Sequence, residues 1–187
     1  LYYAIEDFSV RDYVGGYQDV LARRLKLIGD PETRYREDPV RMLRAVRLAA
    51  KLDFTIDDSA AAPMPALAPL ISGAAPARLF DESLKLFLAG HGEASFLGLE
   101  AHQLLPALMP ETAEALRTNR SGLLRSMVLD GLRNTDQRIA EDKPVTPAFL
   151  YAVLLWPAYC RELARLQAQG LEPAVAQQRA ADRVTLH

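Results

Sequence analysis

The chain has 187 residues, of which 50% are hydrophobic, and a formal net charge of −2. This length and apolar content suffice for a hydrophobic core, while no apolar run approaches the length of a membrane-spanning helix. We therefore expect no membrane span. The near-neutral charge argues against a protein that coats nucleic acid along its whole surface.

One cysteine, Cys160, leaves no internal disulfide possible, which indicates a reducing compartment and predicts a cytoplasmic protein. The three histidines are far apart in the sequence and have no metal-ligand spacing, so we predict no metal site on this chain.

The first thirty residues predict short strands and a turn of helix. Strands are expected at 1–5 and 8–14, followed by the Gly15-Gly16 break, a short helix at 17–24 and a strand at 25–28. This segment is too small to form an independent β domain. We expect it to be the end of a sheet whose other strands precede Leu1, in a longer protein.

From residue 36 onward the pattern is helical almost throughout, with a Pro- and Ala-rich break at 61–66. Pro157 is expected to end or kink a helix. The predicted helices cover 38–52, 66–72, 77–89, 93–105, 122–140, 147–158, 159–169 and 173–186. In the helix at 77–89, the expected buried stripe consists of Leu79, Phe80, Leu84, Phe87 and Leu88. The predicted fold class is mainly α.

The stretch from 36 to 47 opens the first long predicted helix. On a helical wheel, Asp38, Arg44 and Arg47 fall near Arg41, and apolar residues such as Leu43 fall opposite. Arginines spaced three apart can converge on a polyphosphate. A carboxylate and a guanidinium one turn apart offer the acceptors and donors that a nucleobase edge needs. The alternative is a surface ion pair on a solvated helix face.

Three stretches, 12–20, 27–47 and 76–85, together resemble the class II nucleotidyltransferases. This family contains the tRNA CCA-adding enzymes and the bacterial poly(A) polymerases. The stretch 76–85, together with 134–139 and 147–150, resembles the poly(A) polymerase branch more closely.

The resemblance implies a mainly α chain: a helical neck and body, preceded by the last strands of an α/β nucleotidyltransferase head. It divides the chain into the end of the head and the hinge at 1–30, a nucleotide-reading neck at 31–90 and an RNA-binding body at 91–187.

The resemblance also implies roles for individual residues. Asp38 and Arg41 match the base-reading pair, while Arg44 and Arg47 match arginines that contact the nucleotide. The residues that match the hinge motif are Asp12, Gly15, Gly16 and Asp19. The residues that match a motif bracing the neck helices are Arg78, Glu82 and Lys85, for which simple helical ion pairs are the alternative.

The family's Gly-Ser, Asp-x-Asp and Arg-Arg-Asp motifs of the head do not occur in this sequence. Two-metal phosphoryl transfer needs carboxylates that hold Mg²⁺. We therefore assign no catalytic residue and no metal ligand to this chain, and expect Mg²⁺ to bind a head outside it.

The favoured function is template-independent addition of AMP from ATP to RNA 3′ ends, with RNA-decay proteins as possible partners. The alternatives are CCA addition to tRNA and a non-catalytic RNA-binding helical protein. The net-negative helical body argues weakly against the last, because RNA-binding proteins usually carry a basic surface.

Overall fold

A computed structural model describes residues 2–185, so the predictions that concern Leu1, residue 186 and His187 lie outside the described residues. The predicted mainly α fold class is confirmed. The helices before residue 90 are α1 (Gly16–Leu21), α2 (Pro31–Glu37), α3 (Val40–Leu52), α4 (Asp58–Ala61), α5 (Met64–Leu67), the 3₁₀ helix η1 (Ala68–Gly73) and α6 (Pro76–Phe87). The later helices are α7 (Gly92–Ala101), α8 (Leu105–Leu108), α9 (Pro110–Thr118), α10 (Leu123–Ala140), α11 (Pro147–Ala168) and α12 (Pro173–Thr185).

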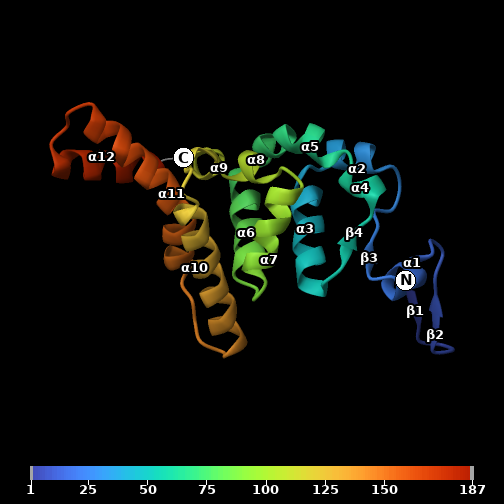
Figure 1. Cartoon of the computed structure of the whole chain (residues 1–187). Helices are drawn as coiled ribbons and strands as arrows, with labels where there is room; N and C mark the ends of the chain where they lie inside the picture. Colours follow the sequence, from blue (N-terminus) through green and yellow to red (C-terminus); the bar gives the residue numbers. More distant parts are fainter. Residues whose placement is uncertain (1, 186–187) are drawn as a thin grey trace.

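Two small two-stranded sheets lie near the N-terminus. An antiparallel hairpin joins β1 (Tyr2–Ala4) to β2 (Ser9–Arg11), and β3 (Arg24–Leu25) pairs in parallel with β4 (Thr55–Ile56). The strand β4 was not predicted, because two residues carry no periodic signal. Figure 1 shows the hairpin and α1 at one end of an elongated molecule and α12 at the other.

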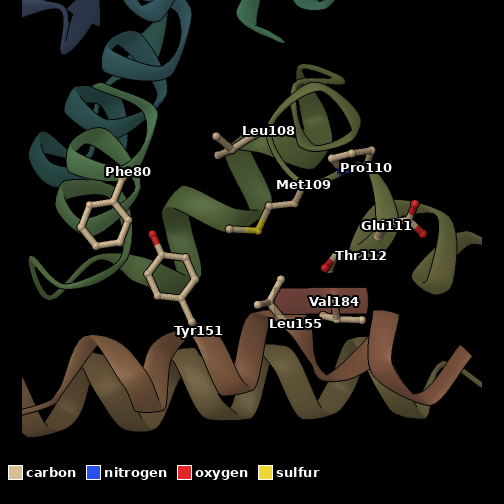
Figure 2. Close-up of a pocket in the computed structure, with 9 residues that line it drawn as sticks. All are labelled: Phe80, Leu108, Met109, Pro110, Glu111, Thr112, Tyr151, Leu155 and Val184. Carbon is tan, nitrogen blue, oxygen red and sulfur yellow. The ribbon is translucent and has the colours of Figure 1, made fainter. Parts of the chain in front are cut away.

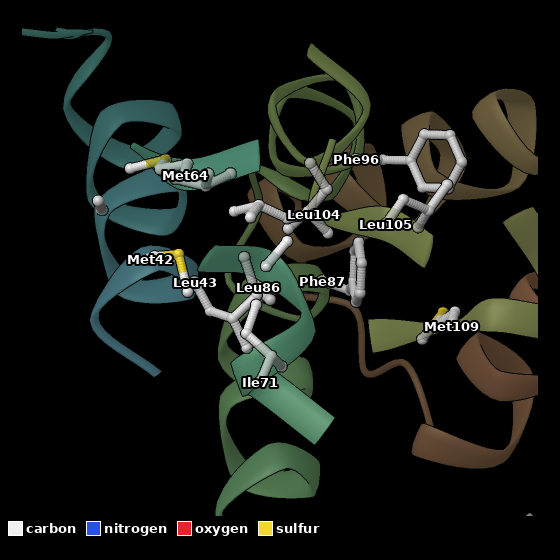
Figure 3. Packing of buried hydrophobic residues seen from close by; sticks show 14 of the residues in the cluster. Met42, Leu43, Met64, Ile71, Leu86, Phe87, Phe96, Leu104, Leu105 and Met109 are labelled. Atoms are coloured by element: carbon white, nitrogen blue, oxygen red, sulfur yellow. The ribbon is translucent and has the colours of Figure 1, made fainter. Parts of the chain in front are cut away.

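The main hydrophobic core lies where α3, α6 and α7 run side by side (Figure 1). Met42 and Leu43 from α3 and Leu86 from α6 are fully buried in it, and Figure 3 shows them gathered at this junction. This core fixes the position of α3 relative to α6, and with it the polar residues that the two helices carry. Within residues 2–185, no helix combines the length and apolar character needed to cross a bilayer.

The helix predicted at 38–52 begins later than expected. A separate helix, α2, ends at Glu37, and α3 begins at Val40. Asp38 between them has extended backbone angles (φ −148°, ψ 94°), because a following proline disfavours the helical conformation. The wheel that placed Asp38 on the same helix as Arg41 is therefore wrong for Asp38.

The expected buried stripe of α6 is only partly correct. Phe87 is buried, but Phe80 is 50% exposed, while Glu82 and Leu86 are buried instead. Hydrophobicity alone could not predict a buried glutamate, because its burial depends on an arginine that another helix supplies.

The expected end of one helix at 158 and start of another at 159 are wrong, since α11 continues through Pro157. The helix starts as predicted, with the Thr146 side chain accepting a hydrogen bond from the Phe149 N–H at 3.3 Å. In the turn before Pro157, the carbonyl of Leu154 accepts a hydrogen bond from the buried Thr112 hydroxyl at 2.9 Å. This bond joins α9 to α11 next to Val153, whose carbonyl loses its usual helical donor at Pro157.

Candidate nucleotide-reading site on the neck helices

The neck cluster consists of Asp38 together with Arg44 and Arg47 of α3 and Arg78 and Glu82 of α6. Arg78 Nη2 donates to both carboxylate oxygens of Asp38 at 3.0 Å. Arg44 Nη1 lies 4.0 Å from the same carboxylate. The contact between Arg78 and Asp38 joins residues forty positions apart in the sequence.

Glu82 forms the buried end of the neck cluster. Its side chain is 3% exposed, and it accepts a hydrogen bond from Arg47 Nε at 2.6 Å. Arg44 Nε lies 3.7 Å from the other carboxylate oxygen. A buried carboxylate needs such partners, because unpaired burial of a charge is costly. Arg44 therefore lies between two carboxylates, Asp38 and Glu82.

Arg41 has different partners. Its Nη1 atom donates to the Glu37 carboxylate at 3.0 Å and to the Arg34 carbonyl at 3.1 Å. The side chains of Asp38 and Arg41 are thus held by opposite neighbours, Asp38 by α6 and Arg41 by α2. The two residues are adjacent through the backbone, where the Arg41 N–H donates to the Asp38 carbonyl at 3.1 Å.

Beside these residues lies a pocket of about 280 Å³, which we call the neck pocket. Arg41 and Arg44 line it together with Lys26, and the buried ring of Tyr35 forms part of its wall. Burial raises the pKa of Tyr35 to about 12, and its hydroxyl donates to the Ala60 carbonyl at 3.0 Å. The neck pocket therefore combines an apolar wall with cationic side chains, which suits a base attached to phosphates.

The predicted hinge residues surround the start of α1. The Asp12 carboxylate accepts backbone hydrogen bonds from Tyr17 at 2.8 Å, Gly16 at 3.0 Å and Val14 at 3.1 Å. These bonds, led by the one from Tyr17, lower the pKa of Asp12 below its usual value. Gly15 has φ +74°, a conformation that glycine adopts readily.

Asp19 connects this region to the neck. Its carboxylate accepts hydrogen bonds from Arg24 at 2.9 and 3.2 Å, and Arg24 Nε also lies 3.4 Å from Asp57. The pKa of Asp57 is lowered, first by the Ser59 hydrogen bonds and then by Arg24. Sequence reasoning missed Arg24 and Asp57, since only the parallel pairing of β3 with β4 makes them neighbours.

Lys85 does not join the neck cluster and has no ion pair within the part of the chain that the structure describes. The described residues also contain no group of three or more His, Cys, Asp or Glu side chains that could hold a metal ion. The residues present therefore do not fit Mg²⁺, and we assign none of them to it.

A second pocket, of about 440 Å³, lies between α6, α9 and α11 and is shown in Figure 2. Phe80 and Tyr151 stack there with ring centroids 5.6 Å apart, and the Tyr151 hydroxyl is 2.5 Å from the Ser83 hydroxyl. Its hydroxyls from Thr112 and Tyr151 already have partners. The pocket is mainly apolar and contains no arrangement suited to nucleotide chemistry.

Comparison with known proteins supports the neck-and-body interpretation. A family model described as "Probable RNA and SrmB- binding site of polymerase A" matches residues 53–116. The chain is 49% identical over 156 residues to proteins named Poly(A) polymerase I from Salmonella typhi and Escherichia coli O157:H7, covering 83% of this chain and 34% of each relative. It is 37% identical over 113 residues to the CCA-adding enzyme of Limosilactobacillus reuteri, covering 59% of this chain and 28% of that relative.

The chain thus spans about a third of the length of the curated relatives that it matches. The match to both branches agrees with the helical architecture built around α3 and α6. Over most of its length the chain is therefore similar to a neck-and-body region of the class II nucleotidyltransferases.

Proposed function

We propose that this chain is the nucleotide-reading and RNA-binding part of a poly(A) polymerase, which adds AMP from ATP to RNA 3′ ends without a template. One observation carries the choice between the two branches. The chain is 43–49% identical to proteins named Poly(A) polymerase I over 83% of its length. It is 33–37% identical to CCA-adding enzymes over 58–59% of its length.

In this proposal the neck pocket receives ATP. Arg41, which lines the neck pocket, and Asp38 beside it contact the edge of the adenine. Arg44, which also lines the pocket, and Arg47, which lies outside its lining, contact the phosphates of ATP. The geometry leaves capacity for this, because a carboxylate offers about four lone-pair sites and a guanidinium five N–H donors. Arg78 and the Val40 N–H together occupy three acceptor sites on Asp38, and only one side-chain nitrogen of Arg41 is hydrogen-bonded. The position of Arg44 between two carboxylates supports an orienting role.

The chemical step in this proposal takes place on a nucleotidyltransferase head that holds Mg²⁺. The exposed aromatic side chains near the hairpin support the proposal that another protein segment packs against this end of the molecule. Tyr2, Tyr3, Phe8 and Tyr13 each expose more than half of their surface. Exposed aromatic residues of this density are typical of a surface that another segment covers.

The proposed partners are RNA and ATP. The partner named SrmB in the family description and other RNA-decay proteins are further candidates for the segment 53–116. The single free cysteine, Cys160, supports a cytoplasmic location.

The test is primer extension by the intact protein on a short unstructured RNA, with each of the four nucleoside triphosphates offered singly. A tRNA that lacks its 3′ end is tested in parallel. We expect a long ladder with ATP alone.

Two other outcomes would contradict this proposal. Two C additions and one A on the tRNA, with no ladder on the unstructured RNA, would assign the protein to the CCA-adding branch. RNA binding without any extension would favour a non-catalytic RNA-binding protein.

A further inference from the structure

A small pocket lies between the ends of α3 and α6 and the start of α7, and we call it the lysine pocket. Its volume is about 90 Å³, which is roughly the share of three water molecules in the liquid. Pockets that enclose organic ligands usually measure about 300 Å³ or more. The lysine pocket therefore suits one small group. Its lining residues are Arg47, Lys51, Lys85, Leu86, Ala89, His91 and Ser95.

Ser95 lines the lysine pocket with an unpartnered hydroxyl. The residue is 1% exposed, and its Oγ atom is buried without a hydrogen-bond partner. The other residues with a hydroxyl that are buried among residues 2–185 are Tyr35, Ser83, Thr112 and Thr135, and each hydroxyl has a partner. An unsatisfied buried hydroxyl is rare, and it points to a bound group, an ion or a water molecule, that supplies the missing bond.

The charge around Ser95 is positive. Lys51 and Lys85 are exposed and form no ion pair within the described residues. Arg47 Nε is bound to Glu82, which neutralises much of its charge. The two lysines therefore leave an excess of positive charge that no lining carboxylate balances.

The start of α7 is already occupied and does not contribute an anion site. Its first backbone N–H groups, those of Gly92 and Glu93, donate to the Asp136 carboxylate at 2.7 and 3.0 Å. The Ser95 N–H donates to the His91 carbonyl at 2.9 Å. Any ligand of the lysine pocket must therefore bind through side chains.

We propose that the lysine pocket binds one tetrahedral oxyanion of the phosphate class through Lys51, Lys85 and the Ser95 hydroxyl. Such a group accepts charge-assisted hydrogen bonds from ammonium groups and a further bond from a hydroxyl. The oxyanion is either free phosphate or a phosphodiester of an RNA strand whose remaining atoms stay outside. This proposal does not rest on polymerase activity, because inorganic phosphate binds irrespective of the reaction.

The competing explanation is that each lysine only interacts with a helix end. Lys51 lies in the last turn of α3 and Lys85 in the last turn of α6, where positive charge is favourable. This account gives the Ser95 hydroxyl no partner other than water and predicts no phosphate binding. A titration with phosphate therefore distinguishes an oxyanion site from lysines that only interact with helix ends.

The experiment titrates inorganic phosphate into the 187-residue chain at constant ionic strength, with chloride as the reference anion. Binding is followed by the melting temperature and by ³¹P NMR line broadening. The variants are Lys51→Gln/Lys85→Gln and Ser95→Ala. The matched controls are Lys143→Gln, an exposed lysine outside the pocket, and Ser72→Ala, an exposed serine on η1.

We expect phosphate to raise the melting temperature more than chloride does. The double lysine variant should bind phosphate at least tenfold more weakly, and both controls should bind like the unmodified chain. Ser95→Ala should weaken phosphate binding several-fold yet raise the melting temperature of the free chain, because it removes an unsatisfied hydroxyl. A packing role for Ser95 would not produce these opposite effects.

A second arm identifies the source of the oxyanion by competition with a short single-stranded RNA. Displacement of phosphate by the RNA, with RNA binding weakened in the double lysine variant, supports a backbone phosphodiester. Phosphate binding that RNA does not displace supports free phosphate. Equal responses to phosphate and chloride, or unchanged phosphate binding in the double lysine variant, would overturn the proposal.

Discussion

Arg41 is the residue on which the proposed base reading depends most directly. Replacing Arg41 with Ala removes charge-assisted hydrogen bonds worth about 1.5–3 kcal/mol. We expect the preference for ATP over CTP in primer extension to fall by about tenfold or more, while the melting temperature changes little. The physical reason is that Arg41 lines the neck pocket and has only exposed or backbone partners on α2.

The matched control for Arg41 is Arg36→Ala. Arg36 is an exposed arginine of α2 that pairs with Glu32 outside the neck pocket. Nucleotide preference should stay unchanged in this variant. An Arg41→Ala enzyme with normal preference would remove Arg41 from the base-reading assignment.

The ion pair of Glu82 with Arg47 tests how burial changes the contribution of an ion pair to the free energy of unfolding. Glu82→Gln leaves Arg47 without its carboxylate in a site where the glutamate is 3% exposed. Since breaking a buried pair typically costs about 3–5 kcal/mol, and Arg47 retains some solvent contact, we expect destabilisation of about 3 kcal/mol. Urea unfolding of the chain measures this loss.

An exposed glutamate on α2 provides the comparison for Glu82. Glu32→Gln breaks a pair in which both side chains are more than half exposed, so it should cost less than about 1 kcal/mol. Equal losses in the two variants would show that the neck cluster does not stabilise the fold through its buried carboxylate.

At the scale of elements, the contact between α3 and α7 depends on Gly98. A Cβ atom at this position would lie 2.8 Å from Val46 Cγ1, and Val46 is 2% exposed with a stiff β-branched side chain. Alanine favours a helix over glycine by about 1 kcal/mol, but overpacking typically costs about 1–3 kcal/mol. We expect Gly98→Ala to be net destabilising by about 1 kcal/mol.

A double substitution tests whether the clash with Val46 is the cause. Gly98→Ala combined with Val46→Ala should lose less stability than the sum of the two single changes, as measured by urea unfolding. Gly73→Ala is the control, because no atom lies within 4 Å of the added carbon. Additive single effects would locate the cost of Gly98→Ala elsewhere.

At the scale of the whole molecule, the free energy of unfolding depends on pH, because folding shifts the pKa values of groups that become buried or hydrogen-bonded. Burial lowers the pKa of His102 below its ordinary value of 6.5. The unfolded chain therefore binds a proton at this site more readily, and stability falls as the pH drops below about 6.5. We expect His102→Gln to remove this part of the loss, measured by urea unfolding between about pH 7.5 and 5.

A separate loss of stability should appear at lower pH in both proteins. The hydrogen-bonded carboxylates, Asp12 and Asp57 among them, have lowered pKa values, so their contribution is lost only as the pH falls through those folded values, below about 4. A His102→Gln chain that loses as much stability as the unmodified one between pH 7.5 and 5 would contradict the assignment to His102.

The sequence by itself predicted the mainly α class, which is confirmed, and the similarity to class II nucleotidyltransferases, because helical periodicity and motif spacing are local properties. It also singled out the candidate residues from Asp38 to Arg47, whose roles stay predictions. The cap at Thr146 was likewise predictable, since a Thr-Pro start signal lies within three residues. The break at Asp38 carried a local signal too, in the proline that follows it.

Only the tertiary structure decided which charges meet. Asp38 lies beside Arg78 and Glu82 beside Arg47, and Ser95 lines one pocket with Lys51 and Lys85. These juxtapositions depend on how α3, α6 and α7 pack around a shared core. The continuity of α11 through Pro157 is likewise a feature of the tertiary structure, in which Pro157 is buried and Thr112 of α9 binds the neighbouring Leu154 carbonyl. Burial and pairing are set by residues distant in the chain, so no local pattern contains them.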